Sequence, residues 1–140
     1  SDPSRGLGDV YKRQMENNPN ISGLFFWPEL HRQIRLEGVV SKTSNVVSDN
    51  YFASRPRGAQ LSAIASSQST EIEGRETVED RIKELEIEFE GKDIPRPDNW
   101  GGYAIDISFW EFWQGRRSRT HDRFIYVKND NSWEITRLSP

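Results

Sequence analysis

The sequence contains no cysteine, two histidines and a single methionine among its 140 residues. The lack of cysteine excludes disulfides, thiolate catalysis and cysteine-based zinc sites, and two isolated histidines are too few for a zinc centre. No apolar run approaches the ~18 residues that cross a membrane, and nothing resembles a signal peptide. We therefore expect a cytoplasmic protein with no metal site and no membrane segment.

Apolar residues are also scarce, at 34% of the chain with a mean hydropathy of −0.83. Five Trp, seven Phe and four Tyr nevertheless supply large apolar area, which argues against disorder. The composition predicts a single domain that completes its core with a partner, such as a second subunit. The net charge of −3 argues against a dedicated nucleic-acid binder.

Residues 1–14 differ from the rest of the chain, because they show neither a helical nor a strand period and carry three glycine or proline breaks. Gly6 and Gly8 resemble the start of a dinucleotide-binding fingerprint, but Tyr11 occupies the position of its third glycine. We interpret residues 1–14 as a foreign, adapter-like segment without regular structure. Residues 15–140 are expected to belong to one domain.

Strands are predicted where apolar and polar residues alternate or aromatic residues cluster. These segments are residues 24–27, 33–40, 103–107, 109–114, 123–128 and 133–138. Helices are predicted over 48–55, 58–67 and 77–91, the first capped by Ser48 and ended by Pro56. The third carries one apolar stripe, formed by Val78, Ile82, Leu85 and Phe89. The pattern predicts an α+β fold around a mostly antiparallel, barrel-like sheet.

The segment from Phe112 to Arg123 is the richest in residues suited to chemistry, with four arginines in eight positions beside Trp113 and His121. Arginine binds phosphate or carboxylate bidentately and stacks on rings, so the segment suits a small anion attached to an aromatic ring. Histidine side chains can exchange a proton near neutral pH, so His121 could share a proton with a phenolic oxygen. A solvated hairpin loop and a nucleic-acid contact remain alternative interpretations.

Tyr51 and Arg55 form a second candidate, because residues four apart on a helix share one face and could clamp one phosphate. An ordinary amphipathic helix end is the alternative. Gln68 and Ser69 offer short donors to a phosphate or a flavin edge, although such Ser/Gln segments usually form turns. Gln33 lies on an expected strand, where cross-strand polar pairing is the alternative.

Eight short motifs follow one another from about Ser22 to the end of the chain: FFW, RQIRLEG, YFASRP, SQS, IPRP with WGG, EFWQG, RTHDR and RLSP. Their order and spacing resemble the pyridoxamine 5'-phosphate oxidase family. The resemblance implies an FMN-binding split β-barrel, mostly antiparallel, of which this chain is the C-terminal half without the N-terminal strands. Because the last motifs match, we expect the chain's natural end to be present.

The resemblance also implies a function. Family members are homodimers that bind FMN at the subunit interface and oxidise pyridoxamine or pyridoxine 5'-phosphate to pyridoxal 5'-phosphate, while O₂ becomes hydrogen peroxide. A non-catalytic split-barrel protein that binds flavin or pyridoxal phosphate is the alternative, and a purely structural fragment is a third reading. Arg119 and His121 favour the oxidase, because a protein that only stores its ligand needs no side chains placed over the carbon that reacts.

Matched position by position, the resemblance assigns roles to ten residues. The expected FMN contacts are Gln33, Gln68, Ser69, Trp113 and Arg123. The expected substrate contacts are Tyr51 and Arg55 at the phosphate, and Arg119, Thr120 and His121 at the pyridine ring. Arg119, over the ring face away from the flavin, and His121 are the expected catalytic residues.

Two departures from the family pattern stand out. Ala59 replaces a serine that usually donates a hydrogen bond to the substrate phosphate. The part of the family sequence that binds the FMN phosphate has no counterpart in this chain. We therefore expect an incomplete fragment with little activity by itself.

Overall fold

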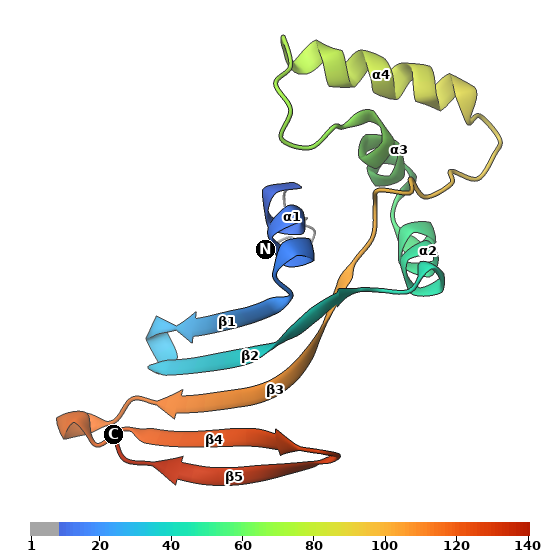
Figure 1. Ribbon diagram of the computed structural model, residues 1–140. Coiled ribbons are helices and arrows are strands. Elements are labelled where there is room, and N and C mark those ends of the chain that lie inside the picture. Colours follow the sequence, from blue (N-terminus) through green and yellow to red (C-terminus); the bar gives the residue numbers. More distant parts are fainter. Residues whose placement is uncertain (1–8) are drawn as a thin grey trace. The chain divides into compact units, whose positions relative to one another are not determined.

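A computed structural model describes residues 9–140 (Figure 1). The helices are α1 (Asp9–Asn17), α2 (Asn45–Ser54), α3 (Arg57–Ala65) and α4 (Arg75–Glu88), with 3-10 turns η1 (Pro28–Leu30) and η2 (Arg117–Arg119). The strands are β1 (Asn20–Trp27), β2 (Arg32–Lys42), β3 (Tyr103–Gln114), β4 (Asp122–Asn129) and β5 (Ser132–Leu138). The chain divides into a helical unit, with residues up to 13 and 42–103, and a sheet unit, with residues 14–41 and 104–140.

Within residues 9–140 the strands form one five-stranded sheet in the order β1-β2-β3-β4-β5 (Figure 1). β1 pairs antiparallel with β2, β3 with β4, and β4 with β5. β2 and β3 are also antiparallel, because backbone hydrogen bonds join Thr43 to Gly102 at one end and Gly115 to His31 at the other. The predicted α+β class with a mostly antiparallel sheet is confirmed.

β3 corrects one predicted boundary. Two strands were expected, over 103–107 and 109–114, but the chain stays extended without a break from Tyr103 to Gln114. Ser108 is neither glycine nor proline and continues the strand alternation, so nothing there forces a turn. The tight connection between β1 and β2 uses Pro28 at the start of a 3-10 turn and His31 in the left-handed region, at φ 49°.

The core of the helical unit is built from Phe52, Leu61, Leu85 and Ile94, each at most 7% exposed. Around it pack the partly buried residues Ala63, Ile64, Ala65, Ile82, Phe89 and Trp100. The apolar stripe predicted for α4 is therefore confirmed at its central positions. Fully burying a side chain such as Leu or Phe is worth about 1.5–3 kcal/mol, so this small cluster is the main source of stability in the unit.

The ends of α2 differ from the prediction. Ser44, rather than Ser48, caps the helix, because its Oγ accepts a hydrogen bond from the Val47 amide at 3.3 Å. Ser48 lies one turn into the helix, buried, with its hydroxyl 2.7 Å from that of Thr43. The helix ends at Ser54, and Arg55 is extended because a following proline disfavours the helical conformation.

Helix α1 overturns the expectation that residues 9–14 lack regular structure. The glycine and proline breaks of the N-terminal segment all precede Asp9, and the residues that follow tolerate a helix. Lys12 Nζ donates a hydrogen bond to the carbonyl oxygen of Asn99 at 3.3 Å. Residues 1–8 of this segment lie outside the described residues, and its foreign origin remains a prediction. Across residues 9–140, every helix is too short or too polar to cross a bilayer.

Candidate functional site

Three of the five residues expected to contact FMN lie level with one another on β2, β3 and β4. Trp113 is directly opposite Arg123 in the β3–β4 register. The Gly115 amide donates to the carbonyl of His31 at 2.7 Å, so these two residues are opposite one another. In an antiparallel pair, Gln33, two residues after His31, then lies opposite Trp113, two residues before Gly115. Directly opposite residues share a face of the sheet. Gln33, Trp113 and Arg123 therefore form one half-buried row, called here the sheet row.

A buried carboxylate fixes the arginine of this row. Glu111, 6% exposed, accepts a hydrogen bond from Arg123 Nε at 2.8 Å and one from Arg35 Nη2 at 3.4 Å. Arg123 Nη1 also donates to the Ser139 carbonyl at 3.2 Å. The hydrogen bond from Arg123, helped by the nearby guanidinium of Arg35, holds the pKa of Glu111 below its usual range despite burial. Glu111 is therefore ionised at neutral pH and anchors the guanidinium plane.

The loop between β3 and β4 carries the residues expected at the pyridine ring. Ser118 and Arg119 both adopt left-handed backbone conformations, at φ 58° and 60°. Each such non-glycine conformation costs about 1–3 kcal/mol and persists only where the surroundings enforce it. The Arg119 side chain is exposed, whereas the Thr120 hydroxyl donates to the carbonyl of Arg117 at 2.8 Å. The loop thus presents the Arg119 guanidinium and uses Thr120 to hold its own shape.

His121 lies against the sheet row, with its ring centroid 4.8 Å from that of Trp113. The backbone amide of Arg116 donates to His121 Nδ1 at 3.0 Å. In the neutral ring, a nitrogen that accepts a hydrogen bond carries no proton, so the proton must lie on Nε2. The loop therefore fixes His121 as a donor at Nε2.

Asp122 closes the base of the same loop. Its carboxylate accepts hydrogen bonds from Arg116 Nε, at 2.7 Å, and from Arg137 Nη2 on β5. Hydrogen bonds from Arg116 and then Arg137 lower the pKa of Asp122. Because Arg116 also donates its amide to His121, the ion pair at the loop base and the orientation of His121 are linked.

In the helical unit, Tyr51 and Arg55 come together on Trp100. The Tyr51 ring stacks on the Trp100 indole, with centroids 5.9 Å apart and planes 18° apart. The Arg55 guanidinium lies over the same indole, 5.0 Å from its centroid. Arg55 Nη1 is buried and has no hydrogen-bond partner within residues 9–140. Leaving a buried charged donor unpaired costs about 1–3 kcal/mol or more, and an anion would recover that cost.

Gln68 and Ser69 occupy an exposed turn between α3 and α4. The Thr70 amide and hydroxyl both bond to the Ser67 carbonyl, at 3.1 and 2.7 Å, and Ser69 has a left-handed backbone at φ 65°. The turn form of this segment, which was the alternative interpretation, is thus present. Gln68 and Ser69 belong to the helical unit, while the other expected FMN contacts belong to the sheet unit.

Sequence reasoning missed the residues that hold the expected contacts in place. In the sequence, Trp100 and Glu111 stand only as members of the WGG and EFWQG motifs, with no role assigned to either. The available signal for Glu111 was a single acidic residue in the aromatic strand segment FWEFW. An acidic side chain on a predicted buried strand needs a cationic partner, and arginines stand on both neighbouring strands.

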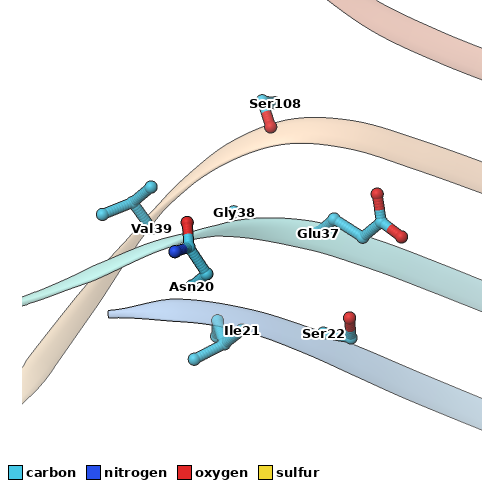
Figure 2. A pocket seen from close by; sticks show the side chains of 7 residues that line it. All are labelled: Asn20, Ile21, Ser22, Glu37, Gly38, Val39 and Ser108. Atoms are coloured by element: carbon cyan, nitrogen blue, oxygen red, sulfur yellow. The ribbon is translucent and has the colours of Figure 1, made fainter. Parts of the chain in front are cut away.

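A shallow pocket on the sheet unit contains none of the expected site residues. Figure 2 shows its lining from three strands: Asn20, Ile21, Ser22, Glu37, Gly38, Val39 and Ser108. Glu37 is ion-paired with Arg35 at 3.0 Å, so the acidic group of the pocket is already neutralised. No cluster of three or more possible metal ligands occurs in the described part of the chain.

Residues 7–88, more than half of the chain, match the family model described as pyridoxamine 5'-phosphate oxidase. The chain belongs to that family. Residues 100–140 match a second model, the pyridoxine 5'-phosphate oxidase C-terminal dimerisation region. The first match begins inside the segment interpreted as foreign and includes α1.

Among the curated relatives, the pyridoxine/pyridoxamine 5'-phosphate oxidase of Rubrobacter xylanophilus is 51% identical over 133 residues, which are 95% of this chain and 61% of the relative. The Flavobacterium johnsoniae protein of the same name is 52% identical over 91% of this chain and 60% of the relative. This member of the family thus spans about three fifths of the length of these relatives.

Two solved structures share the fold. PhzG from Burkholderia lata 383, in complex with tetrahydrophenazine-1-carboxylic acid, superimposes with a TM-score of 0.78 at 30% identity, covering 91% of this chain and 62% of PhzG. A pyridoxamine 5'-phosphate oxidase-related, FMN-binding protein from Nostoc punctiforme gives a TM-score of 0.67 at 14% identity, covering 94% of this chain and 67% of that protein. The second likeness concerns the fold alone.

Proposed function

We propose that this chain is part of an FMN-dependent oxidase that converts pyridoxamine or pyridoxine 5'-phosphate to pyridoxal 5'-phosphate, with O₂ reduced to hydrogen peroxide. The observation that carries the proposal is the buried, unpartnered Nη1 of Arg55, whose guanidinium lies on the same indole, Trp100, that stacks with Tyr51. A buried cationic donor and a phenol that share one indole as neighbour suit a phosphate monoester, whose oxygens can accept hydrogen bonds from both groups.

The sheet row fits a flavin by the chemistry of its donor set. Gln33 can donate to and accept from the polar edge of the ring system, Trp113 offers an aromatic surface, and Arg123 offers guanidinium donors held in one place by Glu111. Because Glu111 and Ser139 already hold the guanidinium of Arg123, binding need not order it again. When bound, the flavin supplies the two-electron chemistry, and the protein supplies position and charge.

Arg119 and His121 are proposed to act on the substrate ring. Arg119, exposed on a strained loop, would stack on the pyridine face with its planar guanidinium and press the substrate toward the flavin. His121 would donate from Nε2 to the substrate's phenolic oxygen, because its Nδ1 already accepts from Arg116. Thr120 would line the ring only as an acceptor, since its hydroxyl proton is directed to Arg117.

The proposed enzyme is a homodimer in the cytoplasm. The match of residues 100–140 to a dimerisation region supports the homodimer. The low apolar content of the chain also fits a protein that completes its core with a second copy. Gln68 and Ser69, on the turn that follows α3, are proposed as further FMN contacts.

The proposal is tested by ligand binding to the chain itself. The wild type should bind pyridoxal 5'-phosphate, and Arg55→Leu should weaken this binding by about 30-fold, because hydrogen bonds to charged groups are worth ~1.5–3 kcal/mol. Titration calorimetry measures both affinities. Arg75→Leu is the matched control, since Arg75 is exposed on α4 and forms a surface ion pair with Glu79. Equal affinities in wild type and Arg55→Leu would contradict the proposal.

The release of hydrogen peroxide distinguishes a catalyst from a protein that only binds the ligands. A full-length protein that carries this sequence should hold flavin, seen in its visible absorbance, and release hydrogen peroxide when pyridoxamine 5'-phosphate is added. Flavin and phosphate binding without peroxide would instead identify a non-catalytic binder.

Ala59→Ser should strengthen binding of pyridoxal 5'-phosphate. Ala59 lies in the first turn of α3, and the family usually has a phosphate-donating serine there. A new hydrogen bond worth about 0.5–1.5 kcal/mol would tighten binding roughly 2- to 10-fold. The same calorimetric titration measures the change. Ala63→Ser, one turn further along α3, should not tighten binding; equal gains from both substitutions would show that the effect is not local to Ala59.

A further inference from the structure

Trp100 contacts both residues assigned to the substrate phosphate. One ring contact joins it to Tyr51, with centroids 5.9 Å apart, and one places the Arg55 guanidinium 5.0 Å from its centroid. The same indole also contacts Phe52 of the core, in a T-shaped pair with centroids 5.1 Å apart and planes at 71°. Trp100 therefore joins the core of the helical unit to the two phosphate-binding side chains.

The backbone of Trp100 is itself tied to the start of α2. Arg96, whose side chain is 12% exposed, donates from Nη1 to the Trp100 carbonyl at 2.5 Å. The same guanidinium bonds to Asp49 at 2.6 Å and to Asn45 at 3.1 Å. The segment from Arg96 to Trp100 thus contacts α2 at two places. Arg96 bonds to its first turns, and the Trp100 indole contacts residues at its end.

We infer that Trp100 is a positioning residue for phosphate recognition, acting through Tyr51 and Arg55. This inference rests on the proposed function. A guanidinium stacked on an indole keeps its donors at its edge, pointing away from the ring, while the contact limits the rotamers of a long side chain. Holding Arg55 in place before the ligand arrives reduces the ordering cost of binding. Trp100 therefore favours ligands that carry a phosphate group over those that lack it.

The alternative account of Trp100 is a core residue and nothing more. A core role predicts lower thermal stability and equal losses of all ligands. A positioning role predicts a selective loss of phosphorylated ligand in a protein that remains folded. The two accounts differ in ligand selectivity, which stability alone does not report.

The experiment compares Trp100→Met and Trp100→Tyr with the wild type. Methionine keeps apolar volume but offers no ring face, whereas tyrosine keeps a face for stacking. Pyridoxal 5'-phosphate affinity should fall about 10-fold in Trp100→Met and at most about 3-fold in Trp100→Tyr, because cation–π contacts of this kind are worth ~0.5–2 kcal/mol. FMN affinity should be unchanged in both. Trp133→Met, on an exposed tryptophan of β5, is the control and should match the wild type.

Arg96→Gln provides a second variant that leaves the indole in the core. It removes the ion pair to Asp49 and weakens the bond to the Trp100 carbonyl, and it should lower pyridoxal 5'-phosphate affinity about 3-fold. This variant decides the matter if Trp100→Met does not fold. Unchanged affinity in a folded Trp100→Met or Arg96→Gln protein, while Arg55→Leu is weakened, would overturn the inference and leave the proposed function standing. A wild type that does not bind pyridoxal 5'-phosphate would overturn both.

Discussion

Arg119→Lys is expected to lower the turnover of a full-length enzyme carrying this sequence by about 100-fold, while its flavin content stays unchanged. The size of the effect follows because small misplacements of reacting groups cost on the order of 10² in rate. Lysine keeps the positive charge at position 119 but lacks the planar surface that would stack on the substrate ring. The strained, left-handed backbone at this residue fixes where the side chain leaves the loop, so an ammonium group cannot regain the stacking position by a small backbone shift.

Two companion variants make this prediction specific. Arg117→Lys changes an exposed arginine of the same loop and should turn over normally. Arg123→Lys should instead lose flavin, because Arg123 belongs to the sheet row and lysine cannot make both the Glu111 and Ser139 contacts. Visible absorbance gives the flavin content, and peroxide release per bound flavin gives the turnover. If Arg119→Lys lost flavin but kept normal turnover per flavin, the roles of Arg119 and Arg123 would have to be exchanged.

Glu111→Gln is expected to destabilise the chain by about 2 kcal/mol at pH 7, since removing one partner of a buried ion pair leaves the other charge uncompensated. The expected loss is smaller than the ~3–5 kcal/mol typical of such changes, because Arg35 and Arg123 keep side-chain exposures of 39% and 32%. For a chain of this size, the loss corresponds to a fall of roughly 5–8 °C in melting temperature, measured by circular dichroism.

The same variant should show a defined pH dependence. The folded protein holds the pKa of Glu111 below the ordinary value of 4.5. The ion pair therefore contributes fully above that pH, and its contribution is lost as the pH falls through the lowered pKa of the folded state. The stability gap between wild type and Glu111→Gln should be widest near neutrality and shrink progressively below about pH 4.5.

The control for Glu111→Gln is Glu134→Gln on β5. Glu134 is exposed and accepts one hydrogen bond, from Asn129 Nδ2 at 3.1 Å, which a glutamine oxygen can accept equally well. This substitution should leave the melting temperature within about 1 °C of the wild type, as expected for a surface change. A gap between wild type and Glu111→Gln that stays constant from pH 7 to pH 3 would show that lost packing, rather than charge, causes the effect.

Much of the fold could be predicted from periodicity. The alternation in β2, the apolar stripe of α4 and the turn between β4 and β5 each depend on local sequence, which a single chain displays in full. The N-cap of α2 was misplaced because Ser44 and Ser48 are chemically equal candidates. Only packing distinguishes them, since the Ser48 hydroxyl is buried against Thr43.

The candidate site was predictable only in part. Tyr51 and Arg55 were paired by helical spacing, yet they meet through the ring of Trp100, some 45 residues away in sequence, which no local pattern reveals. The sheet row likewise depends on register between β2, β3 and β4, and register follows from strand pairing rather than from composition. The left-handed pair in the β3–β4 loop contains no glycine, so its sequence gave no sign of it.

The exposed side chains of β1 bear on how this protein behaves in concentrated solution. Among residues 9–140 this strand is at one edge of the sheet, and Leu24, Phe25 and Phe26 are each more than 50% exposed. An uncharged apolar run on an exposed strand edge can template pairing with another chain. Self-association at high concentration should therefore depend on what covers this edge.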